Sequence, residues 1–180
     1  VDLALLDALN KRAAISLAVG EVKRGAEDNA VFRPGREASL MAELLDKNPG
    51  PLPAEHLKAI YREILSSSRN LQQPQRLAFL GPEGPFSHIA GMELMGSMAT
   101  FHPQLSLEHV FKAVQEGDCD LGIVPLENSL QGSVGPSFDL FSRFSLHIRA
   151  ETYCRIRHSL LSLETDLASV HTVYSHAQPI

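Results

Sequence analysis

Residues 72–84 read Gln-Gln-Pro-Gln-Arg-Leu-Ala-Phe-Leu-Gly-Pro-Glu-Gly, and this stretch decides how the chain is organised. Its proline at position 74 ends any preceding helix, because the proline ring disfavours helical backbone in the residue before it. The apolar run at 77–80 has the length and composition of a short buried strand, and the glycines and proline at 81–84 form a turn. The stretch therefore predicts a boundary between two units, residues 1–74 and 75–180.

The unit before this boundary has the pattern of three helices. Apolar residues recur at helical spacing over residues 1–25, and a glycine followed by polar residues ends that helix. Pro34 opens a second helix that runs to about residue 46, since proline fits the first helical turn. Pro53 opens a third helix that ends before Pro74. We expect this unit to be all-helical.

The unit after the boundary alternates strands and helices. We expect strands at 77–80 and 121–124, near 146–154, and at 170–174, with helices at about 87–96, 106–116 and 136–144. This order predicts βαβ units and a largely parallel sheet.

The composition excludes several classes of protein. The 180 residues are 44% hydrophobic and 21% charged, as in ordinary globular chains, and no apolar run approaches the roughly 18 residues of a membrane span. The net charge of -5 argues against a nucleic-acid partner. Two cysteines are too few for a disulfide scaffold or a four-ligand zinc site, and the first residues do not have the pattern of a secretory signal. We expect a cytoplasmic protein with no metal, no cofactor and no membrane contact.

Polar residues fall within the apolar stripes of two predicted helices. Arg12 lies on the stripe of the first helix, and Lys23 follows eleven residues later, which is three turns plus about 20°. Both cations therefore share the face that we expect to point at the core. On the third helix, Ser68 and Gln72 follow Ile64 at intervals of four residues and continue its apolar side.

Arg36 and Glu37 open the second helix and complete a set of six candidate residues with an excess of positive charge. A cation in a core stripe costs several kcal/mol unless something pairs with it, so a small anion would balance the set. The alternative is that Arg12 and Lys23 extend to the surface and pair there with carboxylates. The set contains no nucleophile–base pair, so it suits a reaction that needs positioning and electrostatic stabilisation.

These residues carry a resemblance. The run Arg12, Lys23, Phe32-Arg33-Pro34-Gly35-Arg36-Glu37, Ser68 and Gln72 resembles the all-helical chorismate mutase family. Its fusion to the following unit is similar to the bifunctional chorismate mutase–prephenate dehydratase family of phenylalanine biosynthesis. The resemblance implies a cofactor-free rearrangement of chorismate to prephenate in an intertwined homodimer.

The resemblance also implies a role for each residue. Arg12 and Arg36 would bind carboxylates of the substrate, and Ser68 would assist at a carboxylate. Lys23 and Gln72 would donate to the ether oxygen, where negative charge builds, and Glu37 would hold the ring hydroxyl. The family supplies one further arginine from a position that would precede Val1, so we expect residues 1–180 alone to have reduced or no mutase activity.

Polar clusters in the second unit follow two predicted strands. Glu127-Asn128-Ser129 comes after the strand at 121–124, and Ser175-His176-Ala177-Gln178 comes after the strand at 170–174. Open α/β sheets bind ligands at the carboxyl ends of their strands. The alternative for each cluster is a helix N-cap with a polar loop. The turn at 81–88 can meet an anion at a helix N-terminus, or it can use its glycines for packing alone.

In this order the clusters resemble the prephenate dehydratase signature: Gly-Pro-x-Gly-x-Phe-Ser, Val-Pro-x-Glu-Asn-Ser and Ser-His-x-Gln. The resemblance implies decarboxylation and dehydration of prephenate to phenylpyruvate, in a cleft between two lobes like those of periplasmic binding proteins. It implies a cleft lined by Glu127, Asn128, Ser129, Ser175, His176 and Gln178. Pro85 and Ala177 depart from the family pattern. The family's later Thr-Arg-Phe motif is not within residues 1–180, so we expect these residues alone not to dehydrate prephenate.

A second function from a different class stays open. The chain could be a non-catalytic module that senses a small acid and dimerises through its helical hairpin. A sensor would have no reason to aim Lys23 and Gln72 at one atom, so the effect of Gln72→Ala on turnover and on affinity separates the two readings.

Overall fold

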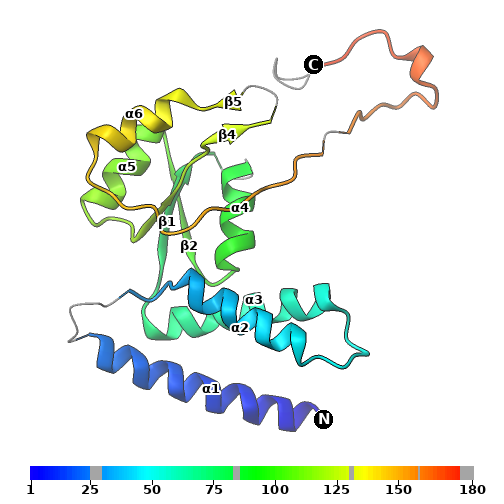
Figure 1. The fold of residues 1–180 in the computed structure, drawn as a ribbon. Helices are drawn as coiled ribbons and strands as arrows, with labels where there is room; N and C mark the ends of the chain where they lie inside the picture. The colour runs from blue at the N-terminus through cyan, green and yellow to red at the C-terminus, as the bar shows by residue number, and fades with distance from the viewer. Residues whose placement is uncertain (25–29, 83–85, 130–131, 158, 175–180) are drawn as a thin grey trace.

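The structure, a computed structural model, describes residues 1–24, 30–82, 86–129, 132–157 and 159–174 (Figure 1). Three helices come first, α1 (Asp2–Lys23), α2 (Pro34–Asp46) and α3 (Ala54–Gln72), as expected. Pro34 occupies the first turn of α2. Glu37 lies in the same turn, where the positive end of the helix dipole favours a carboxylate. None of the helices formed by the described residues is long and apolar enough to cross a membrane.

The second unit is built around a three-stranded parallel sheet with the strand order β2-β1-β3. Its elements, in chain order, are β1 (Arg76–Leu80), α4 (Phe86–Met95), β2 (Thr100–Gln104), α5 (Leu107–Gln115), β3 (Leu121–Ile123), β4 (Glu127–Asn128), β5 (Gly132–Ser133), α6 (Gly135–Arg143) and a 3-10 turn (Leu167–Ser169). The short strands β4 and β5 pair antiparallel with each other. The expected fold class, a helical unit followed by βαβ units, is confirmed.

The central strand β1 is covered on both faces. Leu77 and the ring of Phe79 face α4, where His88 stacks on that ring at 4.8 Å between centroids. Ala78 points to the other face and packs with Val110 of α5. Figure 1 shows α4 and α5 on opposite sides of the sheet. Burial on both faces explains why residues 77–80 of β1 are all apolar.

Strand β2 was missed by the sequence analysis. Its sequence, Thr-Phe-His-Pro-Gln, includes Pro103, which ordinarily argues against a strand. Because β2 pairs only with β1 in the described sheet, it is an edge strand, and an edge tolerates a proline whose missing N–H faces outward.

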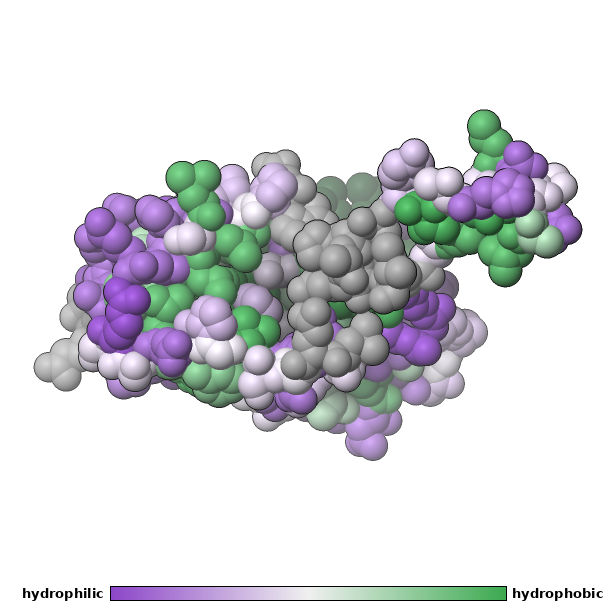
Figure 2. All heavy atoms as spheres, turned by 90° about the horizontal axis from the view of Figure 1, so that it is seen from above, coloured by the Kyte–Doolittle hydropathy of each residue, from purple (hydrophilic) through white to green (hydrophobic). Residues whose placement is uncertain are grey.

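The strands expected near 146–154 and at 170–174 are wrong. Both segments are described as irregular chain. A strand needs a neighbour for its backbone hydrogen bonds, and among the described residues neither segment has one. Residues 159–174 extend away from the sheet (Figure 1), and Figure 2 shows apolar side chains gathered on this segment. Leu161 and Leu163 are almost fully exposed there.

The expectation that the apolar stripe of α1 faces the core within one chain is also wrong. Ile15 is 66% exposed and Val22 is 76% exposed, whereas the buried residues of α1 are Ser16 and Gly20. The small residues allow α1 to approach α3 closely, and this leaves the larger apolar side chains on the outside of the single chain.

Candidate functional site

The contact between α1 and α3 brings the first predicted residues together. Arg12, Ser16 and Gly20 follow one another at intervals of four residues along the side of α1 that meets α3. Ser16 donates its hydroxyl hydrogen to the carbonyl oxygen of Arg12 at 3.1 Å. Gly20 lies against the backbone of Gln72, so the predicted donor on α3 meets α1 at a point between the predicted cations Arg12 and Lys23 in the sequence.

The guanidinium of Arg12 is half-buried, and its Nε atom is buried without a hydrogen-bond partner among the described residues. Burying a polar N–H without a partner is unfavourable, and for part of a charged group the cost is larger. An anion bound beside Nε would remove this cost. Arg12 is therefore placed as a carboxylate-binding residue would be.

Lys23 is half-buried and donates from Nζ to the carbonyl oxygen of Ala30 at 2.7 Å. The contact holds the lysine side chain near the start of α2 instead of letting it extend into solvent. Neither Arg12 nor Lys23 is fully exposed, and this argues against the alternative that both pair at the surface.

The α2–α3 contact positions Glu37. Its two carboxylate oxygens accept hydrogen bonds from Nη1 of Arg69, at 2.6 and 2.5 Å. Arg36, the neighbouring predicted residue, is exposed, so the single chain does not enclose it. The same contact therefore orders one of the two predicted α2 residues and leaves the other open.

The two predicted residues of α3 face inward. Ser68 is buried, and Gln72 is half-buried and donates from Nε2 to the carbonyl oxygen of Ser68 at 3.1 Å. The last turns of α3 thus meet α1 through Gln72 and α2 through Arg69. A hollow lies between α5 and α6, and none of the six predicted mutase residues lines it.

Sequence reasoning missed Arg69. It follows Ser68 directly and reads as an ordinary basic residue in the last turn of a helix, where cations are favoured. The signal that was available was its position among Ser66, Ser68 and Gln72, at the end of a helix whose buried residues are mostly polar.

The second predicted cluster lies past the carboxyl end of β3, as expected. Glu127 and Asn128 form β4, and Ser129 begins the following turn. Asn128 is half-buried, while Glu127 and Ser129 are exposed. The predicted residues Ser175, His176 and Gln178 lie outside the described residues, as does the Glu83–Pro85 part of the turn after β1.

A second missed residue supports this cluster. Ser137 of α6 is fully buried and donates its hydroxyl hydrogen to the carbonyl oxygen of Pro125 at 2.7 Å. Pro125 lies between β3 and β4, so the bond fixes the segment that leads into Glu127 and Asn128. In the sequence, a serine three residues into a helix signals no more than a polar surface position.

The pKa values of two side chains, Glu63 and Cys119, are shifted from their ordinary values. Glu63 of α3 accepts hydrogen bonds from the hydroxyl and the backbone N–H of Ser97, at 2.6 and 3.0 Å, and the hydroxyl bond is the main cause that lowers its carboxyl pKa. Burial raises the pKa of the Cys119 thiol, which therefore stays protonated and unreactive at neutral pH.

Comparison with known proteins found a matching family for each of the two units. Residues 1–73 match the family chorismate mutase type II, and residues 77–180 match the family prephenate dehydratase. Proteins named bifunctional chorismate mutase/prephenate dehydratase from Stutzerimonas stutzeri and Pseudomonas aeruginosa are 37% and 36% identical to the whole chain. The Escherichia coli K12 protein of the same name is 32% identical over 99% of it.

The chain spans about half the length of these relatives, 51% in each of the three cases. The search of solved structures found no match for the chain. The prephenate dehydratase match covers more than half of the 180 residues. The chain therefore belongs to the prephenate dehydratase family and carries a chorismate mutase type II domain in front of it.

Proposed function

We propose that the helical unit rearranges chorismate to prephenate. The observation that carries this is the buried Nε of Arg12, which has no partner among the described residues and lies on the side of α1 that meets Gln72. A doubly charged small acid supplies the carboxylate that this group lacks. The match of residues 1–73 to chorismate mutase type II supports chorismate as this acid.

The rearrangement breaks the ether C–O bond as a C–C bond forms, and no proton leaves or enters the substrate. Negative charge builds on the ether oxygen, so donors aimed at that atom lower the barrier by about 2–4 kcal/mol each. Lys23 and Gln72 are these donors. Arg12 and Arg36 bind the carboxylates, Ser68 assists at one of them, and Glu37 accepts the hydrogen bond of the ring hydroxyl.

The protein acts as a homodimer in this proposal. In the single chain, α1 exposes large apolar residues along its length: Leu3, Leu5, Leu6, Ile15, Leu17 and Val22. About 25 cal/mol is gained for each Å² of such surface that is covered, so a second α1 is a suitable partner. Sedimentation equilibrium tests this, and a monomer at micromolar concentration would contradict it.

The second unit contributes to a prephenate dehydratase, in which the ring carboxylate leaves as CO2 and the ring hydroxyl leaves as water. Glu127, Asn128 and Ser129 line its cleft from the carboxyl edge of the sheet, together with Ser175, His176 and Gln178. The position of β4 directly after β3 supports the first three. Formation of phenylpyruvate from prephenate tests this activity.

The test of the mutase activity uses the full-length protein that contains residues 1–180. Chorismate loss and prephenate formation are followed together. The loss of chorismate is expected to run well above the uncatalysed rate and to equal the sum of the prephenate and phenylpyruvate that form. Tight binding of chorismate without turnover would favour the sensor reading.

A further inference from the structure

Arg69 is the one charged residue that is buried within the described part of the chain, with 3% of its surface exposed. Its Nη1 atom donates to both carboxylate oxygens of Glu37 in α2. Its Nη2 atom donates to the backbone carbonyl of Met95 at 2.6 Å, at the end of α4 in the second unit. The guanidinium carbon also lies 5.6 Å from the centre of the Phe32 ring. One side chain thus connects both units.

Two acceptors on different helices stabilise the buried Arg69 cation. The carboxylate of Glu37 balances the charge, whose burial without a partner would be strongly unfavourable. The Met95 carbonyl is one of the last in α4, where helix carbonyls lack partners and where the helix dipole favours a cation. The planar guanidinium fork can serve both acceptors at once, which a lysine ammonium does with less directional control.

The Glu37 carboxylate keeps capacity for a ligand. Its side chain is 21% exposed, against 4% for Arg69. A carboxylate has about four acceptor positions, and the two bonds from Arg69 use two of them. Arg69 directly follows Ser68 and precedes Gln72 by three residues, so the carboxylate is held at the same turns of α3 that carry two proposed mutase residues.

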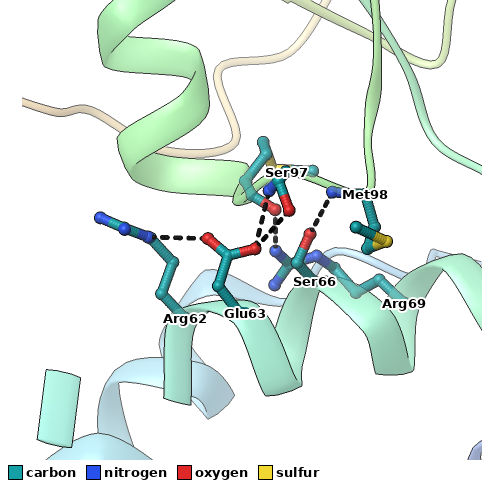
Figure 3. Close-up of polar contacts among 7 residues, drawn as sticks. Arg62, Glu63, Ser66, Arg69, Ser97 and Met98 are labelled. Carbon is teal, nitrogen blue, oxygen red and sulfur yellow. Dashed lines mark hydrogen bonds and ion pairs between the residues drawn. The ribbon is translucent and has the colours of Figure 1, made fainter. Parts of the chain in front are cut away.

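The α4 end of the connection is itself fixed. The turn after α4 is bound to α3 by Glu63, which accepts from Ser97, and by the hydroxyl of Ser66, which accepts from the Met98 N–H at 3.0 Å (Figure 3). A Cβ on Gly96 would come within 2.6 Å of the Ser66 Cβ, so the turn lies directly on α3. The Met95 carbonyl is therefore a rigid acceptor.

We propose that Arg69 is a positioning residue of the mutase site: it orients the Glu37 carboxylate toward the ring hydroxyl of the substrate and anchors it on the Met95 carbonyl of the dehydratase unit. This inference rests on the proposed mutase function and adds to it that the dehydratase unit helps to build the mutase site. Arg69 does not touch the substrate in this proposal.

The test compares chorismate with an analogue that lacks the ring hydroxyl, in the protein and in its variants Arg69→Gln, Glu37→Gln and Glu63→Gln. We expect Arg69→Gln to lower kcat/KM for chorismate by about 10- to 100-fold, the scale of a misplaced contact, mainly through KM. Activity on the analogue should change little. The preference for chorismate, which is the ratio of kcat/KM for chorismate to kcat/KM for the analogue, should therefore fall toward the value for Glu37→Gln. Combining the two substitutions adds little more.

Glu63→Gln is the matched control, because it weakens the same contact between units without touching Glu37. The Arg69–Glu37 pair stays intact in this variant and only the support of the Met95 carbonyl is weakened, so Glu63→Gln is expected to lose much less of the preference for chorismate than Arg69→Gln. The ratio of the two substrates, measured on one sample, does not depend on the fraction of protein that is folded, so a destabilised Arg69→Gln remains informative. An unchanged ratio in Arg69→Gln, or an equal loss in Glu63→Gln, would overturn the inference. An inactive unsubstituted protein would instead overturn the proposed function.

Discussion

Gly20 of α1 lies in direct contact with the backbone of Gln72 in α3. A Cβ built on Gly20 would stand 2.8 Å from the Gln72 carbonyl oxygen and 2.9 Å from its Cα. Backbone atoms cannot rotate away as a side chain does, so this contact sets the separation of the two helices. That separation places Arg12 and Lys23 relative to Gln72, which are the residues proposed to bind and polarise the substrate.

Gly20→Ala is therefore expected to destabilise the helical unit by about 1–3 kcal/mol, the usual cost of overpacking. In a helix without this contact, the same change would be favourable by up to about 1 kcal/mol. Gly35→Ala in α2 is the matched control, because a Cβ there meets nothing within 4 Å. The free energy of unfolding measured in urea and the mutase rate should both fall for Gly20→Ala and stay unchanged for Gly35→Ala. Equal effects of the two substitutions would contradict the role given to the Gly20–Gln72 contact.

The helices of the first unit could be predicted from the sequence because their boundaries carry prolines and their apolar residues recur at helical spacing. What could not be predicted is which side of α1 faces inward. Its apolar residues occur almost all around, so the pattern does not single out the small residues Ser16 and Gly20 as the contact. Periodicity reports hydrophobic faces, whereas this contact depends on close backbone approach.

The candidate site shows the same limit. The inward positions of Ser68 and Gln72 followed from their spacing after Ile64. The role of Arg69 depends on Met95, 26 residues further along the chain, and no local pattern relates the two. Long-range pairing of this kind becomes visible only when the helices and the sheet are placed together.

Cys119 and Cys154 are expected to differ in reactivity. Burial raises the pKa of the Cys119 thiol, whereas the Cys154 residue is partly exposed. The thiolate is the reactive form, so a disulfide reagent at pH 7 should label one thiol in the native protein and two in denaturant. A Cys154→Ser variant should then show no rapid labelling. Rapid modification of Cys119 in that variant would contradict its burial.

Ser137→Ala is expected to destabilise the second unit by about 1–3 kcal/mol, because it leaves the Pro125 carbonyl without its partner. Ser142→Ala on the same helix is the control, since the exposed Ser142 hydroxyl donates to the Asp139 carbonyl at the same 2.7 Å. Denaturant unfolding of the two variants checks this. A loss for Ser142→Ala as large as that for Ser137→Ala would show that burial of the bond is not the cause.

The stabilising effect of Glu63 should depend on pH. Its pKa is lowered in the folded protein, chiefly by the Ser97 hydroxyl, so folding favours the ionised form. This contribution is present above the ordinary carboxyl pKa and is lost as the pH falls through the lowered value. Glu63→Gln should cost about 0.5–1 kcal/mol at pH 7, since the group is partly exposed, and progressively less as the pH falls toward 3.

Glu55→Gln is the control for this pH dependence, because Glu55 pairs with Lys58 within α3 and does not reach the second unit. Unfolding free energies of both variants are measured from pH 3 to pH 8. A difference between Glu63→Gln and the unsubstituted protein that grows as the pH falls would have the wrong sign and would remove the assignment.

Gln72→Ala separates catalysis from binding. If the Gln72 amide donates to the ether oxygen as charge builds there, its removal raises the barrier by about 2–4 kcal/mol and leaves the ground state nearly unchanged. The mutase kcat should then fall by about 30- to 1000-fold while KM changes little. Gln73→Ala, at the exposed end of α3, should leave both constants unchanged. A loss of affinity with unchanged turnover in Gln72→Ala would instead identify a residue that binds the small acid without acting on it.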